Sequence, residues 1–241
     1  MRLAFVADIH GNLTALEAVI QDIKKAAPDA VYHLGDLAGN GSRPSEAVDR
    51  IRDLGWPGVH GNVDEMLWAP ERLADLAWRA PERQLLRKVL FEELAPRDRA
   101  ALGPERVAWL KSLPCRLDIG EITLVHASPD DLWRAPLATA PDAEFEATYR
   151  SLGAKAVVYA HIHHPHVRRL SGLVVANTGS VSLPYDGDPR SSYLLFTDGT
   201  WQTRRIEYAV EAEVRLLEEH NVPRAAWLAS LLRTGKYQPP F

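Results

Sequence analysis

The feature that most constrains the fold of this chain is an alternation of short apolar runs with helical patterns near its start. Apolar runs at 2–7, 30–34 and 58–60 predict three strands, each ending abruptly in polar residues. Apolar residues recur at helical spacing after Asn12, which is expected to cap that helix, and again over 44–54. This β-α-β-α-β order predicts a sheet with parallel strands and helices packed against it.

The rest of the chain divides into a helical stretch, a group of strands and a helical end. Residues 65–113 show helical patterns throughout, and we interpret them as a helical cap inserted into the domain. Strand patterns return at 122–125, 156–160, 167–170, 173–176, 193–197 and 203–208. Asp198 and Gly199 predict a hairpin turn, and 209–241 form a C-terminal helical extension. Residues 1–241 are therefore expected to make one α/β domain.

The composition excludes several classes of protein. A single cysteine, Cys115, rules out a disulfide framework and a thiolate metal cluster. The formal net charge of −4 argues against a surface built mainly to hold nucleic acid or an anionic membrane. No run of about 18 apolar residues is present, so we expect a cytoplasmic protein without a membrane partner. The nine histidines, in contrast, direct attention to a site of imidazole and carboxylate ligands.

Polar side chains follow five of the expected strands, at the point where each strand ends. They are Asp8, His10, Asp36, Asn62, His126, His161 and His163. In an open α/β sheet, ligands bind in the crevice at the carboxyl ends of the strands, so we expect these residues to meet there. Imidazole and carboxylate together suit Mn, Fe, Co, Ni or Zn. Seven donors exceed what one ion with an open position needs, and they suit two divalent ions that share a bridging carboxylate.

In sequence order these residues form the blocks D-x-H, G-D, G-N-x-D, H and H-x-H. This order resembles the calcineurin-like metallophosphoesterase superfamily, from Asp8 to His163 and again at 177–181. The likeness is strongest to bacterial single-domain phosphoesterases. It implies a four-layer α-β-β-α sandwich of two mixed β-sheets, with helices outside and the metals at one edge. It also implies an enzyme, a metal-dependent phosphoric ester hydrolase.

The resemblance implies a role for each donor. One ion would bind Asp8, His10, Asp36 and His163. The other would bind Asp36, Asn62, His126 and His161, so that Asp36 bridges the pair. Both would be divalent transition metals, with manganese favoured and Fe, Zn, Ni or Co as alternatives. A hydroxide between them would attack phosphorus in line, with Asp36, Asn62 and His126 as the catalytic residues and Asn62 near a phosphate oxygen.

One position departs from the pattern of many family members. Where they carry G-N-H-[DE], with a His that acts as general acid or stabilises the leaving oxygen, this chain has Val63. A positioned proton donor is worth about 10²–10⁴-fold in rate, so esters with poor leaving groups should react slowly. The expected function is therefore hydrolysis of phosphodiesters or nucleotide-type substrates. The alternatives are a phosphomonoesterase or protein Ser/Thr phosphatase, a dinucleoside polyphosphate hydrolase, and a non-catalytic metal-binding scaffold.

Three residues near these blocks are candidates for contacts with a small phosphate-ester or nucleotide substrate. Asn40 lies in a Gly-rich loop after Asp36 that could approach the phosphate, and the alternative is a plain turn. His164 could reach the substrate or belong to a solvated loop. Arg190 is a candidate substrate clamp.

Other residues leave two interpretations open. Four tryptophans in or just after the cap could offer a face to a nucleobase or form the cap's own core. They are Trp68, Trp78, Trp109 and Trp133. Asp64 is expected either to orient a ligand or to cap a helix. Ser180 is expected either to orient His161 or His163 or to form an ordinary turn.

Overall fold

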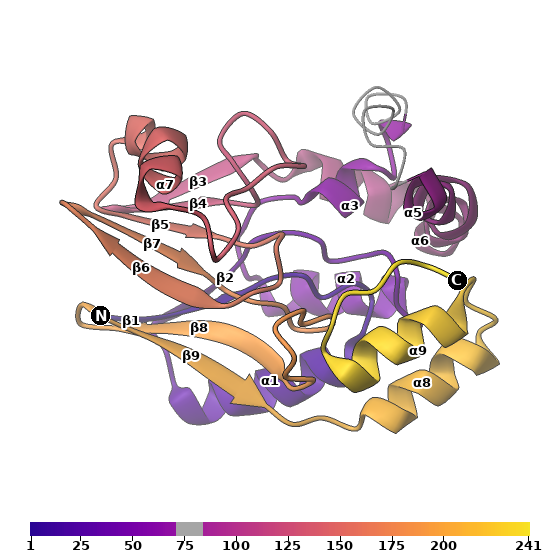
Figure 1. Cartoon of the computed structure of the whole chain (residues 1–241). Coiled ribbons are helices and arrows are strands. Elements are labelled where there is room, and N and C mark those ends of the chain that lie inside the picture. The colour runs from indigo at the N-terminus through magenta and orange to yellow at the C-terminus, as the bar shows by residue number, and fades with distance from the viewer. Residues whose placement is uncertain (71–83) are drawn as a thin grey trace.

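Two mixed β-sheets lie face to face at the centre of the molecule, and the computed structural model describes residues 1–70 and 84–241 (Figure 1). One sheet has the order β2-β1-β8-β9, with β2 at Ala30–His33, β1 at Arg2–Val6, β8 at Ser191–Thr197 and β9 at Thr200–Ile206. The other has the order β3-β4-β5-β7-β6, with β3 at Arg116–Ile119, β4 at Ile122–Val125, β5 at Ala156–Tyr159, β7 at Leu173–Asn177 and β6 at His166–Leu170. Each sheet combines parallel and antiparallel pairs.

Strand β1 is buried on both faces. Ala4 and Val6 belong to the core shared with α1 (Leu13–Ala26), whereas Leu3 and Phe5 belong to the core between the two sheets. Successive side chains of a strand point to opposite faces, so one continuous apolar run serves both layers. The predicted four-layer sandwich is therefore confirmed.

The outer layers are helical. Helices α1 and α2 (Pro44–Leu54) contribute to the core on the outer face of the first sheet. On the far side, α7 (Asp142–Tyr149) covers the outer face of the second sheet (Figure 1). Its Phe145 and Tyr149 belong to the core on that face. Asn12 caps α1 as predicted, its Oδ1 accepting a hydrogen bond from the Ala15 N–H at 2.9 Å.

The described part of 65–113 is mostly helical. It packs against the core of α1 and α2 and against the C-terminal helices. It contains the end of α3 (Asn62–Glu65), then α5 (Gln84–Lys88), the π-helix η2 (Val89–Leu94) and α6 (Ala95–Ser112). Leu102 and Leu110 of α6 join the core of α1 and α2, and Trp68 and Trp109 pack against the same core. Trp78 lies outside the described residues. A kink at Gly103 divides α6, so that Pro104 begins its second half.

The C-terminal region packs against the π-helix. It consists of α8 (Val210–Glu219) and α9 (Ala225–Thr234), which share a core with Val89 and Leu94 of η2. Arg224 adds a two-pronged pair to Glu93, with nitrogen–oxygen distances of 2.8 and 2.9 Å. In the described residues, no helix combines the length and the apolar character needed to cross a membrane.

Two local predictions need correction, and one turn is confirmed. The strand expected at 58–60 is only a single bridge between Gly58 and His33. Strand β3 was not expected, because Arg116 and Asp118 interrupt its apolar pattern at an edge of the sheet. The hairpin at Asp198 and Gly199 is confirmed, and both residues have the positive φ that such a tight turn requires.

Candidate metal centre

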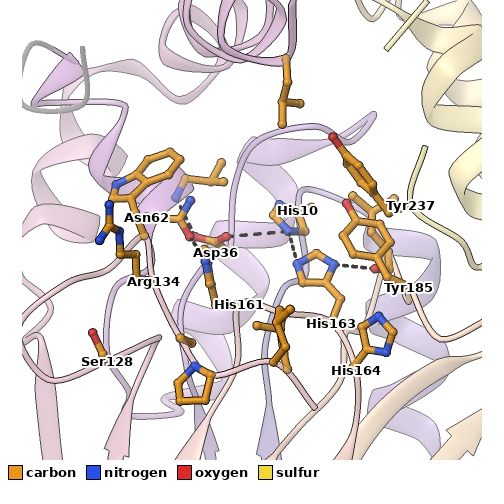
Figure 2. Close-up of a pocket in the computed structure, with 18 of the residues that line it drawn as sticks. His10, Asp36, Asn62, Ser128, Arg134, His161, His163, His164, Tyr185 and Tyr237 are labelled. Carbon is orange, nitrogen blue, oxygen red and sulfur yellow. Dashed lines mark hydrogen bonds and ion pairs between the residues drawn. The ribbon is translucent and has the colours of Figure 1, made fainter. Parts of the chain in front are cut away.

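The seven predicted donors converge at one edge of the sandwich, where several strands end. Asp8 and His10 follow β1, Asp36 follows β2, and His126 follows β4; Asn62 opens α3, and His161 and His163 follow β5. Six of these side chains are buried, and His161 is partly exposed. Figure 2 shows five of them, from Asn62 and His161 across to His10 and His163, with Asp36 between. The seven residues therefore lie together at one edge of the sandwich, as predicted.

The backbone at these donors is strained. Five of the seven have positive φ, in the left-handed region. They are Asp8 (55°), His10 (48°), Asp36 (51°), His161 (66°) and His163 (55°). A non-glycine residue pays roughly 1–2 kcal/mol for this conformation, and such residues concentrate at functional sites. These residues lie directly after β1, β2 and β5, so their turns set the directions of the side chains at the edge.

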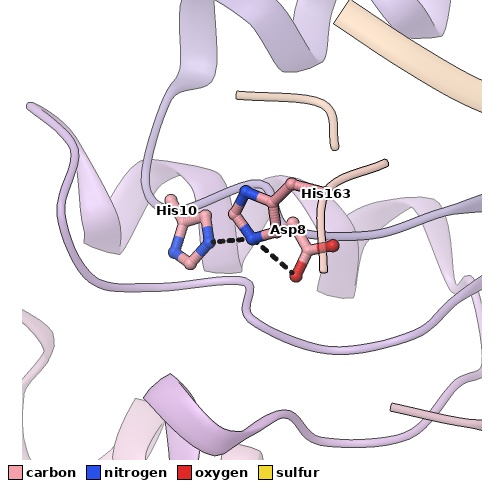
Figure 3. A group of neighbouring side chains, drawn as sticks. All are labelled: Asp8, His10 and His163. Carbon is pink, nitrogen blue, oxygen red and sulfur yellow. Dashed lines mark hydrogen bonds and ion pairs between the residues drawn. The ribbon is translucent and has the colours of Figure 1, made fainter. Parts of the chain in front are cut away.

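Asp8, His10 and His163 form one group of potential metal ligands (Figure 3). The Nε2 atoms of His10 and His163 lie 3.4 Å apart, and His163 Nε2 lies 3.5 Å from Asp8 Oδ1. The Nδ1–H of His163 donates to the Leu183 carbonyl. That bond fixes the tautomer of the neutral ring, so the lone pair of Nε2 is directed into the group.

Asn62, His126 and His161 form the other side of the centre. Asn62 Oδ1 lies 2.8 Å from His126 Nε2 and 2.8 Å from His161 Nδ1. The Nδ1 atom of His126 lies 2.7 Å from the Leu34 carbonyl oxygen and donates to it, which leaves the lone pair of Nε2 facing Asn62. The arrangement again presents nitrogen and oxygen lone pairs to a common point.

Asp36 lies between the two sides. Its Oδ2 is 3.8 Å from His10 Nε2 and 3.6 Å from His126 Nε2. Its Oδ1 accepts a hydrogen bond from the Val63 N–H at 2.8 Å, which holds the carboxylate in this orientation. Asp8, Asp36 and His126 also form a group of potential ligands, so Asp8 belongs to both groups. A carboxylate oxygen placed between one histidine of each side can bridge two ions.

The pKa shifts of two histidines in the centre suit metal ligation. Burial, and then the nearby His163, lowers the pKa of His10 to about 3. Burial and the nearby His126 lower the pKa of His161 to about 3 as well, so both rings are neutral near pH 7. Burial, with the charges of Asp64 and Asp8, raises the pKa of Asp36 well above its usual range. A bound cation would favour the ionised carboxylate and the neutral imidazoles.

One buried atom in particular fits the binding of a metal ion. Asp8 Oδ1 is buried and has no hydrogen-bond partner among the described residues. An unpaired buried acceptor costs about 1–3 kcal/mol, which a coordinated cation would offset. This atom, with the mixed nitrogen and oxygen donors around it, fits a transition-metal ion.

Asp64 and Ser180 form hydrogen bonds to the backbone of the segments that carry the donors. Asp64 accepts hydrogen bonds from the N–H groups of Leu37, Ala38 and Gly61, so it links the loop after Asp36 to the start of α3. It therefore both caps that helix and holds a ligand loop. The Ser180 hydroxyl donates to the Asp8 carbonyl at 2.9 Å rather than to the ring of His161 or His163.

A cavity of about 900 Å³ opens over the donors. Two of the three residues predicted to contact substrate line it. Asn40 and His164 line it, and the Oδ1 atom of Asn40 is buried without a hydrogen-bond partner among the described residues. Arg190 does not line this cavity, because its guanidinium pairs with Asp188 at 2.6 Å.

Other lining residues were not predicted as substrate contacts. Arg134, Tyr185 and Tyr237 lie on loops or on the chain end and line the same cavity, and no local sequence pattern marks them. Trp133, one of the four tryptophans considered above, lines the cavity and stacks on Phe91 with ring centroids 6.1 Å apart.

Comparisons with known proteins agree with this architecture. The chain is 27% identical over 257 residues to an uncharacterized protein of Methanocaldococcus jannaschii, covering 97% of this chain and 98% of that protein. It is 24% identical over 211 residues to the phosphodiesterase YfcE of Escherichia coli, covering 82% of this chain and 89% of that protein. The crystal structure of a metallophosphoesterase from Sphaerobacter thermophilus is 28% identical, with a TM-score of 0.79, over 98% of this chain and 99% of that one.

Residues 1–200 match the calcineurin-like phosphoesterase superfamily domain, a stretch that contains all seven donors. The resemblance inferred from the sequence blocks is therefore confirmed. The chain is an enzyme that hydrolyses phosphoric esters, and it belongs to the calcineurin-like phosphoesterase superfamily.

Proposed function

We propose that the protein hydrolyses phosphodiesters, including nucleotide-type diesters, with two divalent transition-metal ions held by the seven donors. The observation that carries this proposal is the position of Asp36, whose Oδ2 lies within 3.8 Å of a histidine on each side of the centre. Two ions bound there would lower the pKa of a water between them and neutralise charge on the phosphoryl oxygens. Manganese is the favoured metal, with Fe, Zn, Ni and Co as alternatives.

In this proposal, the chain's own groups divide into binding and orienting roles. Asp8, His10 and His163 hold one ion, and Asn62, His126 and His161 hold the other. Asp36 contributes to both, and the Val63 N–H keeps its carboxylate in place. The carbonyls of Leu183 and Leu34 keep His163 and His126 in the tautomer that can bind metal.

The preference for diesters rests on the surroundings of Val63. Its side chain is buried in a small apolar cluster with Met66 and Ala95, and it lines the cavity. A valine side chain cannot protonate a leaving oxygen, so esters that need such help should be poor substrates. The relative YfcE of Escherichia coli is a phosphodiesterase, which agrees with this preference.

A pair of substrates with the same leaving group tests the proposal. Bis(4-nitrophenyl) phosphate and 4-nitrophenyl phosphate both release 4-nitrophenolate, so their ratio of kcat/KM isolates the diester preference. With Mn²⁺ we expect the diester to be favoured by about 10-fold or more, and EDTA should abolish both reactions. A clear monoester preference would overturn the diester assignment. Hydrolysis of neither substrate with any of the five metals would favour a binding scaffold.

A further inference from the structure

The residues that line the cavity over the metal centre include two groups. Val63, Leu90 and Trp133 belong to one apolar cluster, and Arg134 follows Trp133 in the chain. Leu183, Tyr185 and Trp227 belong to another cluster, and His164 and Tyr237 line the cavity with them. Figure 2 shows Arg134 on one side of Asp36 and His10, and Tyr185, Tyr237 and His164 on the opposite side. We call these the Trp133 arm and the Tyr237 arm.

The Tyr237 arm is built directly onto a metal-site residue. The Tyr185 ring lies flat against the His163 imidazole, with centroids 4.5 Å apart and an angle of 13° between the ring planes. The Tyr185 N–H donates to the His163 carbonyl at 3.1 Å. Tyr237 meets Tyr185 edge-on, with centroids 5.5 Å apart. The two tyrosines therefore extend an aromatic wall outward from the centre.

The chain segment that carries Tyr237 is fixed on two sides. The Gly187 N–H donates to the Gly235 carbonyl at 2.8 Å, which ties the segment to the loop after Tyr185. The indole N–H of Trp227 donates to the Gln238 carbonyl at 2.8 Å, which ties it to α9. Because these bonds already hold the aromatic wall in place, a ligand would not have to order it on binding.

The chemistry of this arm suits a planar aromatic group. Its wall combines two tyrosine rings and a tryptophan with the apolar Leu183, and flat rings bind such walls by stacking or edge contacts. Many family members carry a His at the Val63 position that acts on the leaving oxygen, so we assign the Trp133 arm to the leaving group. A phosphomonoester fills one arm only, whereas a diester carries a second substituent for the other.

We propose that the Tyr237 arm is a subsite for a planar aromatic substituent that stays on phosphorus, with Tyr237 as its specificity-determining residue. This inference rests on the proposed diesterase function. The matched family domain ends at residue 200, so Trp227 and Tyr237 come from outside it. The subsite thus combines residues of the phosphoesterase domain, such as Leu183 and Tyr185, with two aromatic residues of the C-terminal extension.

Two diesters that differ only in the retained group test the inference. In bis(4-nitrophenyl) phosphate and methyl 4-nitrophenyl phosphate, water oxygen bonds to phosphorus and the bond to 4-nitrophenolate breaks, while the other ester stays. Tyr237→Ala should lower kcat/KM for the bis-aryl diester by about 10-fold and leave the methyl diester within about 2-fold. Tyr237→Phe should keep most of the activity. Phe241→Ala, an exposed residue of the same segment, is the matched control and should change neither.

Calorimetry gives a second readout that does not depend on turnover. The Mn²⁺-loaded wild-type protein should bind diphenyl phosphate about 10-fold more tightly than dimethyl phosphate, and Tyr237→Ala should remove most of that difference. Equal losses on both substrates, or no loss in Tyr237→Ala, would overturn the subsite. If the wild type hydrolyses neither diester, the proposed function fails, and the binding difference alone then decides the inference.

Discussion

The backbone N–H of Val63 donates a hydrogen bond of 2.8 Å to Oδ1 of Asp36. The residue that departs from the family pattern thus supports the central carboxylate through its main chain, which no substitution removes except proline. Its side chain is separate from that role and lines the cavity. The side chain can therefore be changed to test leaving-group chemistry while the bond to Asp36 is kept.

Val63→His should supply a proton donor for the leaving oxygen. We expect turnover of phenyl phosphate, whose leaving phenolate is more basic than 4-nitrophenolate, to rise by about 10-fold or more, because an imidazole can donate the proton that valine cannot. Val63→Phe is the matched control, since it adds a ring of similar size without a proton donor. Steady-state kinetics with Mn²⁺ measures both variants. Equal rates for the His and Phe variants would contradict the leaving-group argument.

Asp36→Asn should raise the stability of the metal-free protein and weaken its binding of metal. Asparagine keeps an oxygen that can accept from the Val63 N–H, but it removes a buried negative charge close to Asp8. The metal-free variant should be more stable than metal-free wild type by about 1–2 kcal/mol, and it should lose the stabilisation by Mn²⁺. Thermal unfolding with EDTA and with Mn²⁺ measures both effects. Asp53→Asn, which removes an exposed carboxylate, should change neither.

The gain in stability of the metal-free Asp36→Asn variant over metal-free wild type should also depend on pH. Burial raises the pKa of Asp36 in the folded state well above the usual range of a carboxyl group. A group with a raised pKa contributes stability that is present below its unfolded pKa and is lost as pH rises through the folded pKa. The stability difference between metal-free variant and wild type should therefore grow from about pH 5 to pH 8. Denaturant titrations at fixed ionic strength measure it, and a difference that shrinks would refute this account.

Asp64→Ala should weaken metal binding without touching a ligand. It leaves the buried N–H groups of Leu37, Ala38 and Gly61 without their acceptor, at a cost of roughly 1–3 kcal/mol each before relaxation. The loops that carry Asp36 and Asn62 would then separate. We expect a Kd for Mn²⁺ that is raised by about 10–100-fold, with Asp64→Asn recovering part of the loss. Calorimetric titration measures the Kd, and an unchanged value would show that Asp64 only caps α3.

Most of the donors and the sandwich could be predicted from the sequence because every donor except Asn62 follows a short, mainly apolar strand. The run of β5, for example, is buried along its whole length and ends where His161 begins its turn. Strand β3 gave no such signal, because Arg116 and Asp118 on this edge strand leave no apolar run. The expected strand at 58–60 forms only one bridge to β2, at Gly58 directly after Pro57, which has no N–H to donate.

The walls of the cavity could not be predicted in the same way. Tyr185 and Tyr237 are separated by 52 residues of chain, and hydrogen bonds between distant segments, such as that from Gly187 to Gly235, hold them together. Trp133 lies on a loop after β4, where no periodic pattern fixes the direction of its side chain. Contacts of this kind depend on tertiary packing, whereas the local hydrophobic pattern is enough to predict where a strand ends.

Metal stoichiometry tests the central claim most directly. Protein stripped with EDTA, reconstituted with Mn²⁺ and freed of excess ion should contain two Mn²⁺ per chain by elemental analysis, and diester hydrolysis should return with the metal. Asn62→Ala, which removes an oxygen between His126 and His161, should lower the content toward one ion and abolish hydrolysis. One ion or none per chain, with full diester hydrolysis, would contradict the account.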